Sequence, residues 1–340
     1  QLSSTVVTGD DNIENSGAVV ATSVAEALSA GVSVAVEGVA AGSSTSTSDS
    51  RAVAIDGGAG SDTITNTVTG DLVATSVAEA NAVDVSITGA GLAVAAPATF
   101  DGGTTAKSEA IGISGDGQGS DLDMSGNVQV IDEGVFLGAH LASTAATGND
   151  TIENAGTVAV TSVAAAPSVA VSVAVGGVAV TESQSTGESL AVAVDAGAGD
   201  DTVTNTGSLV STSVANADTV SVSVAPAGVA IAAGAFWDGG TTADSEAIGI
   251  SGDGKGLDLH ADGNIEITDD AIQVETALSA TAVSGDDTIT NEGTVVASSA
   301  AGALTVDVSV DVGGVAGAVA AATARSRAAA IDAGAGNDTI

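Results

Sequence analysis

Aspartates that follow glycine recur along the chain, and their type and spacing suit the binding of a hard cation. Each belongs to a Gly-x-Asp or Gly-x-Gly-x-Asp peptide, and these peptides end at Asp11, Asp62, Asp121, Asp150, Asp201, Asp258, Asp287 and Asp338. Glycine permits a positive-φ corner without a steric cost, and a carboxylate is the kind of oxygen ligand that calcium takes. The plainer interpretation of each peptide is a solvated Gly-Asp turn, which is common in proteins.

The intervals between these anchor aspartates show a repeat within a repeat. Along the chain they are 51, 59, 29, 51, 57, 29 and 51 residues, so a large unit of 139 and then 137 residues contains smaller ones. We divide the chain into repeat 1 (residues 1–147), repeat 2 (148–284) and a partial repeat 3 (285–340). Such self-similarity indicates units that stack on one another. Since the third copy stops inside a motif, we expect the chain to be a segment of a longer one.

Between the anchors the residues alternate with a period of two, which is the pattern of a β-strand. The clearest run, residues 304–312, places Leu and Val on one face and Thr, Asp and Ser on the other. The filling residues are small, and aromatic residues make up only 1% of the chain. The sequence therefore predicts an all-β fold, a stacked β-solenoid similar to a parallel β-helix, in which each repeat buries its apolar edge on the next.

Two features leave alternatives open. A 29-residue interval is too short for a coil of the size that 51 residues make, so it is either a truncated coil or a cover on one side. A string of β-sandwich modules is the other architecture, although a sandwich core normally relies on the large side chains that are scarce here.

The nonapeptide from Gly57 to Thr65 fits the pattern G-G-x-G-x-D-x-U-x, where U is apolar, and resembles the calcium-binding repeat of the RTX family of secreted bacterial proteins. The peptides that begin at Ala196 and Ala333 are similar, with Ala in the first Gly position. The resemblance implies that calcium is the cofactor and that the anchor aspartates are its ligands. A second carboxylate six residues before an anchor could join each site, at Asp56, Asp195 and Asp332.

The chain departs from that family in two ways. Its nonapeptides stand 29 to 59 residues apart, whereas the family repeats them in tandem, so a complete site needs the next coil to bring a second acidic corner alongside. Asp121 and Asp258 also lack the apolar residue two positions later and have Asp123 and His260 there. If the coils stack, anchors such as Asp11 and Asp62 lie about 4.8 Å apart.

An asparagine follows most anchors at a distance of four residues, at Asn15, Asn66, Asn154, Asn205 and Asn291. By parity it shares the face of the anchor. We expect these side chains to form an amide ladder, in which each amide bonds to its equivalent above and below.

Composition excludes several classes of partner and weakens others. With 5 Lys+Arg against 43 Asp+Glu, the net charge is −38, and such a chain is a poor ligand for nucleic acid. No apolar run is long enough for membrane insertion, and the absence of cysteine excludes disulfides and thiolate sites. The basic residues and histidines are few and look like scattered surface charge: Arg51, Lys107, His140, Lys255, His260, Arg325 and Arg327.

These features favour a structural role. A polysaccharide-active enzyme on a β-helix is the first alternative, but the few bases and cations make an enzyme improbable. An ice-binding threonine array is the second, and Glu14 and Glu153 interrupt it. The chain resembles the repetitive parts of giant bacterial surface proteins: a filament or adhesin stalk, or else a surface layer, at an extracellular or cell-surface location. We expect end-to-end self-association, and a cell-surface or glycan target is left unnamed.

Overall fold

The computed structural model describes residues 2–3, 9–95, 103–116, 122–130, 137–144, 148–233, 240–253, 259–267, 274–281 and 285–340. Within these ranges every regular element is a β-strand and there is no helix. All paired strands are parallel. The predicted all-β, solenoid-like fold is confirmed.

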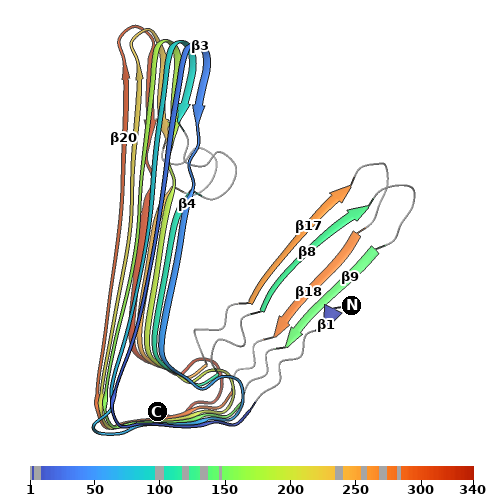
Figure 1. Ribbon diagram of the computed structural model, residues 1–340, viewed down its shortest axis with the longest axis vertical. Coiled ribbons are helices and arrows are strands. Elements are labelled where there is room, and N and C mark those ends of the chain that lie inside the picture. Colours follow the sequence, from blue (N-terminus) through green and yellow to red (C-terminus); the bar gives the residue numbers. More distant parts are fainter. Residues whose placement is uncertain are drawn as a thin grey trace.

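Five coils lie on top of one another, and each contributes one strand to each of three sheets (Figure 1). The coils comprise residues 9–59, 60–116, 148–198, 199–253 and 285–335 and are called coils 1 to 5. The corner sheet holds β2 (Asn12–Asn15), β5 (Thr63–Asn66), β10 (Thr151–Asn154), β13 (Thr202–Asn205) and β19 (Thr288–Asn291). The long sheet holds β3 (Ala18–Gly42), β6 (Asp71–Ala95), β11 (Thr157–Glu182), β14 (Ser208–Ala225), β15 (Gly228–Ala233), β20 (Thr294–Asp311) and β21 (Val315–Val319). The return sheet holds β4 (Ser46–Asp56), β7 (Thr104–Ser114), β12 (Ser185–Asp195), β16 (Thr241–Ser251) and β22 (Ala322–Asp332).

The long sheet folds back on itself at a glycine. Gly38, Gly91 and Gly177 occupy the same register position and have φ values of 102°, 130° and 135°. A side chain at Gly91 would collide with the carbonyl group of Gly38 in the coil below. The chain can therefore reverse there only with glycine, and it then descends toward the return sheet.

The 29-residue intervals do not form coils of the stack. The backbone N–H of Asp62 bonds directly to Asp150, 88 residues away, so the chain between coils 2 and 3 makes an excursion. Its strands β8 (Leu122–Val130) and β9 (Leu137–Thr144) pair instead with β17 (Leu259–Ile267) and β18 (Val274–Thr281) of the next excursion, and β1 (Leu2–Ser3) pairs with β9. Figure 1 shows these strands as an arm that leaves the foot of the stack. The expected truncated coil or cover was wrong.

The core contains large side chains only near the corner. There Ile64, Ile152, Leu72, Leu209 and Ile113 are fully buried between the three sheets, and they form one apolar cluster. Farther up, the space between the long and return sheets is filled by Ala and Ser, as in the small cluster of Ala78, Ala106 and Ala164. Small side chains let the two sheets approach closely, which is how a chain with so few aromatics packs.

A continuous chain of serine hydroxyls joins the long and return sheets through all five coils. Each Oγ lies 2.8–2.9 Å from the next, and the series alternates between the two sheets. Its members are Ser23, Ser50, Ser76, Ser108, Ser162, Ser189, Ser213, Ser245, Ser299 and Ser326. We call it the serine chain. It fixes which residue of the long sheet faces which residue of the return sheet.

The expected amide ladder is confirmed. Asn15, Asn66, Asn154 and Asn205 each donate a side-chain N–H to the Oδ1 of the equivalent asparagine in the next coil, at 2.7–2.9 Å, and the last acceptor is Asn291. Asn66, Asn154 and Asn205 are almost completely buried. The ladder therefore satisfies buried amides along the whole stack.

Replacing Asn154 with Ala should destabilise the fold clearly. It removes the acceptor of the Asn66 amide and the donor to Asn205, so two buried groups lose their partners. We expect a loss of about 2–3 kcal/mol, seen as a lower melting temperature. As a control, exposed Glu153 on the same strand should tolerate Ala with little change. A similar loss from both variants would contradict a special role for the ladder.

Candidate functional site at the acidic corner

The anchor aspartates form one column at the corner of the stack. The backbone N–H of each anchor donates to Oδ1 of the anchor in the next coil, from Asp11 through to Asp338, at 2.7–3.1 Å. The members are Asp11, Asp62, Asp150, Asp201, Asp287 and Asp338. We call this the aspartate column. The expected stacking of Asp11 with Asp62 is confirmed.

The middle residue of each Gly-x-Asp peptide makes a second ladder in the opposite direction. Its side-chain oxygen accepts the N–H of the equivalent residue in the next coil, as Asp10 accepts from Ser61 at 3.1 Å and Asp200 from Asp286 at 2.8 Å. This position is held by Asp10, Ser61, Asn149, Asp200, Asp286 and Asn337. Any short polar acceptor serves here. The motif therefore has a structural use, since both ladders hold successive coils together at the turn.

The aspartate column keeps one oxygen of each inner carboxylate without a partner. Oδ2 of Asp62, Asp150, Asp201 and Asp287 is buried and accepts no hydrogen bond, and these side chains are only 1–2% exposed. At Asp150 this oxygen lies against Gly115, where a Cβ would collide with it and with the carbonyl oxygen of Ala196. Gly57 and Gly252 leave similar room beside Asp62 and Asp287. Carboxylate and carbonyl oxygens thus face the same glycine-lined spaces.

Burial makes these carboxylates reluctant to ionise. Burial raises the pKa of Asp201 to about 8 and that of Asp150 to about 7, against the bond from a backbone N–H, and neighbouring carboxylates add to both shifts. The pKa of Asp287 rises to about 6 for the same reasons, and that of Asp62 is also raised. A charge-neutralising partner, either a proton or a cation, would relieve this column.

Asp116 and Asp253 belong to the corner as well, and the sequence analysis missed them. The Asp116 carboxylate accepts the N–H of Gly148 at 3.1 Å and that of Ala198 at 2.5 Å. Burial raises its pKa to about 6. Asp253 accepts from Gly285 at 3.2 Å and from Ala335. Each therefore clips the point at which the chain returns from an excursion, and the signal was their position directly before the Gly-x-Gly-x-Asp peptide.

The proposed second carboxylates form no continuous column. Asp56, Asp195 and Asp332 occupy alternate coils, and Ser114 and Ser251 stand between them in register. Asp56 is exposed and accepts the N–H of Gly58 at 3.1 Å, Asp195 is buried, and Asp332 accepts from Arg327 at 2.9 Å.

Two anchors, Asp121 and Asp258, lie outside the described residues, and the stack passes from Asp62 to Asp150 and from Asp201 to Asp287 without them. Within the described part of the chain, no group of three or more His, Cys, Asp or Glu side chains is arranged to hold a metal ion. The donor chemistry of the column nevertheless fits a hard cation, because its unpartnered atoms are carboxylate oxygens beside backbone carbonyls.

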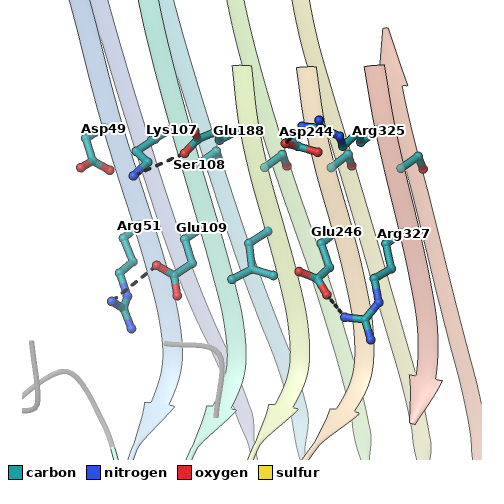
Figure 2. A pocket seen from close by; sticks show the side chains of 14 residues that line it. Asp49, Arg51, Lys107, Ser108, Glu109, Glu188, Asp244, Glu246, Arg325 and Arg327 are labelled. Atoms are coloured by element: carbon teal, nitrogen blue, oxygen red, sulfur yellow. Dashed lines mark hydrogen bonds and ion pairs between the residues drawn. The ribbon is translucent and has the colours of Figure 1, made fainter. Parts of the chain in front are cut away.

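The basic residues are gathered rather than scattered. Arg51, Lys107, Arg325 and Arg327 all project from the outer face of the return sheet (Figure 2). They face carboxylates of neighbouring coils in the pairs Arg51–Glu109 (3.5 Å), Lys107–Glu188 (3.3 Å), Arg325–Asp244 (3.5 Å) and Arg327–Glu246. Lys255 lies outside the described residues, and the side chains of His140 and His260 are not described either.

This charged face joins coils 1 to 2, 2 to 3, and 4 to 5. Between coils 3 and 4 the register instead places Glu188 beside Asp244 and Leu190 beside Glu246. Partly exposed pairs of this kind contribute about 0–1 kcal/mol each. Their main effect is to favour one order of coils over another.

Comparison with known proteins adds no family to these observations. The described residues contain no helix of the length and apolarity needed to cross a membrane. No family model, curated protein or solved structure matches the chain. The resemblance to RTX repeats is thus carried by the motif residues alone, and the function has to be argued from the stack and its corner.

Proposed function

We propose that this chain is a structural protein, a segment of an extracellular filament or adhesin stalk whose acidic corner takes up calcium. The observation that carries the proposal is the aspartate column, in which every coil repeats the same carboxylate-to-backbone bond with its neighbour. The amide ladder and the serine chain repeat in the same way. A coil built like this offers an equivalent coil the same contacts, so the stack extends by repetition.

The choice of residue supports the calcium part of the proposal. Asparagine would accept the same backbone bond as aspartate, and the middle position of the motif does use Asn149 and Asn337. The inner position is nevertheless Asp at all six corners of the stack, even though burying a carboxylate is costly. We infer that the charge itself is used. Calcium at extracellular concentrations would occupy weak oxygen sites of this kind.

A structural role also agrees with the outer strands. In coils 1 and 5 the strands of the three sheets each have one edge without a neighbour among the described strands, apart from the isolated bridge between Thr288 and Thr339. Unpaired edges of this kind accept further strands from the same chain or from another copy. End-to-end association and a location outside the cell are parts of the same proposal. A surface layer is the alternative assembly.

Negative-stain electron microscopy of the purified native material, with and without chelator, tests this function. We expect thin rods or fibres in calcium that shorten, fray or disperse when calcium is removed. A two-dimensional lattice would instead favour a surface layer. Compact particles of one size, unchanged by chelator, would contradict the proposal.

A further inference from the structure

The upper part of the long sheet has its apolar residues on the outside. In coil 5, Thr305, Asp307, Ser309 and Asp311 point inward, whereas Val306, Val308 and Val310 point outward and are 39%, 41% and 45% exposed. The period-two pattern distinguishes two faces of this strand, and the polar one is inside. This is the reverse of the usual arrangement of a strand in a soluble protein.

Hydrogen bonds hold the polar face inside. Ser168 bonds to Ser183 at 2.8 Å, Thr219 bonds to Thr241 at 2.7 Å, and the buried carboxylate of Asp84 accepts the N–H of Ser44 at 2.9 Å. A shift of one residue would turn the valines inward, but it would break each of these bonds. The outward position of the valines is therefore fixed by the fold.

The outward residues form a flat patch of three rows across five coils. Residues in one row are register partners in neighbouring coils. The members are Ala30, Val32, Val34, Val83, Val85, Ile87, Val169, Val171, Val173, Val220, Val222, Val224, Val306, Val308 and Val310. We call this patch the valine face. From strand dimensions it measures roughly 20 Å by 24 Å, or about 500 Å².

A patch of this size without charge calls for a partner. The largest apolar patch on a typical monomer is about 300–600 Å² and is often functional. Farther down the same outer surface the apolar rows give way to Glu26, Glu79 and Asp218. The valine face is thus an uncharged area on a molecule with a net charge of −38.

We propose that the valine face is the site at which a second copy of this chain packs face to face. Two copies repel each other wherever acidic surfaces meet, and they can approach closely at an uncharged patch. Equal rows of valine are also self-complementary, because the side chains of one flat sheet fit between the rows of another. Two such patches bury about 1,000 Å² in total, near the lower limit for a specific interface, so a five-coil segment forms a weak dimer.

A lipid surface is the less favoured occupant. The described basic side chains lie on the return sheet, on the opposite side of each coil, so none flanks the valine face to attract anionic headgroups. Aromatic residues, which anchor proteins at a membrane interface, make up only 1% of the chain. Lateral pairing also differs from end-to-end association, because it leaves the edges of the outer coils unused.

The test is sedimentation velocity over a range of concentrations in calcium-free buffer. The intact segment should show a reversible monomer–dimer equilibrium. The triple variant V85T/V171T/V222T keeps the shape and strand preference of valine but adds a hydroxyl at the centre of the patch, and it should weaken the dimer at least roughly tenfold. The matched control V77T/V163T/V214T changes outward valines of the same three strands below the patch, and it should leave the equilibrium unchanged.

Cross-linking identifies the geometry, because the chain contains no cysteine. Val171→Cys, at the centre of the patch, should form an intermolecular disulfide under mild oxidation, whereas Leu190→Cys on the return sheet of the same coil should not. A segment that stays monomeric at every concentration would overturn the proposal, as would equal weakening by both triple variants. If the segment stays monomeric but floats with phosphatidylcholine vesicles, and V85T/V171T/V222T abolishes flotation, lipid is the occupant and the proposal is wrong.

Discussion

In calcium-free buffer the protein should become more stable as the pH falls from 8 to 5. The carboxylates of Asp150 and Asp201 have pKa values of about 7 and 8 in the folded chain, whereas an unfolded aspartate has a pKa near 3.9. Between these values the folded state binds more protons than the unfolded state. The stabilisation is therefore complete below pH 4 and is lost as the pH rises through 7 and 8.

The expected effect is large, because several buried carboxylates titrate together. A gain on the order of 5 kcal/mol between pH 8 and pH 5 corresponds to roughly 5–10 °C in melting temperature. Scanning calorimetry in buffers freed of divalent cations measures it. A melting temperature that is equal or higher at pH 8 would contradict the burial of unpartnered carboxylates at the corner.

Asp150→Asn separates the column from the general effect of net charge. Oδ1 of the new amide still accepts the N–H of Asp62, and its NH₂ group takes the place of Oδ2 beside the carbonyl oxygen of Ala196. At pH 8 without calcium we expect this variant to melt above the parent protein and to respond less to pH. Exposed Asp218 is the control, since Asp218→Asn removes the same charge away from the corner and should change neither property.

Replacing two members of the serine chain with valine should be the most damaging change in the core. Ser162 and Ser189 face each other at 2.9 Å in coil 3, between sheets lined with alanine and serine. Valine there removes two hydroxyl links and adds volume where little room exists. Together we expect a loss on the order of 4 kcal/mol and a melting temperature lower by about 5 °C.

Thr161→Val provides the matched control for the serine chain. Thr161 is the neighbour of Ser162 on β11, but its side chain is exposed on the outer face. The same exchange of a hydroxyl residue for valine should therefore have almost no effect on melting. If Ser162→Val and Ser189→Val together were as mild as this control, the serine chain would not be holding the two sheets in place.

Much of this architecture follows from the sequence because its signals are local. The interval of 51 residues and the period-two alternation predict a stacked all-β coil, and the parity of Asn154 relative to Asp150 predicts the amide ladder. Both rest on the geometry of a single strand, in which alternate residues share a face. The structure confirms each of them.

The remaining features depend on contacts between distant segments. The excursion from Leu122 to Thr144 was read as a coil or cover because its glycine-aspartate letters imitate a corner. Alternation alone does not say which face of β20 is inside, and the bonds to the descending chain decide it. The pairs between coils, such as Lys107–Glu188, have no signal within either strand. The serine chain did leave one, the recurring Thr-Ser-Val-Ala peptide that contains Ser23, Ser76, Ser162 and Ser213.

Calcium uptake by the aspartate column is the central claim, and thermal melting at pH 8 in calcium compared with chelator tests it most directly. We expect calcium to raise the melting temperature by several degrees, because a ligand that binds only the folded state stabilises it. The rise should be smaller in a variant with Asp62→Ala and Asp201→Ala, and it should persist in Asp218→Ala. Asp84 is no suitable control, since its side chain is buried and burial raises its pKa. Identical melting curves in calcium and chelator would mean that the corner is held by its hydrogen bonds and protons alone, and the claim would be wrong.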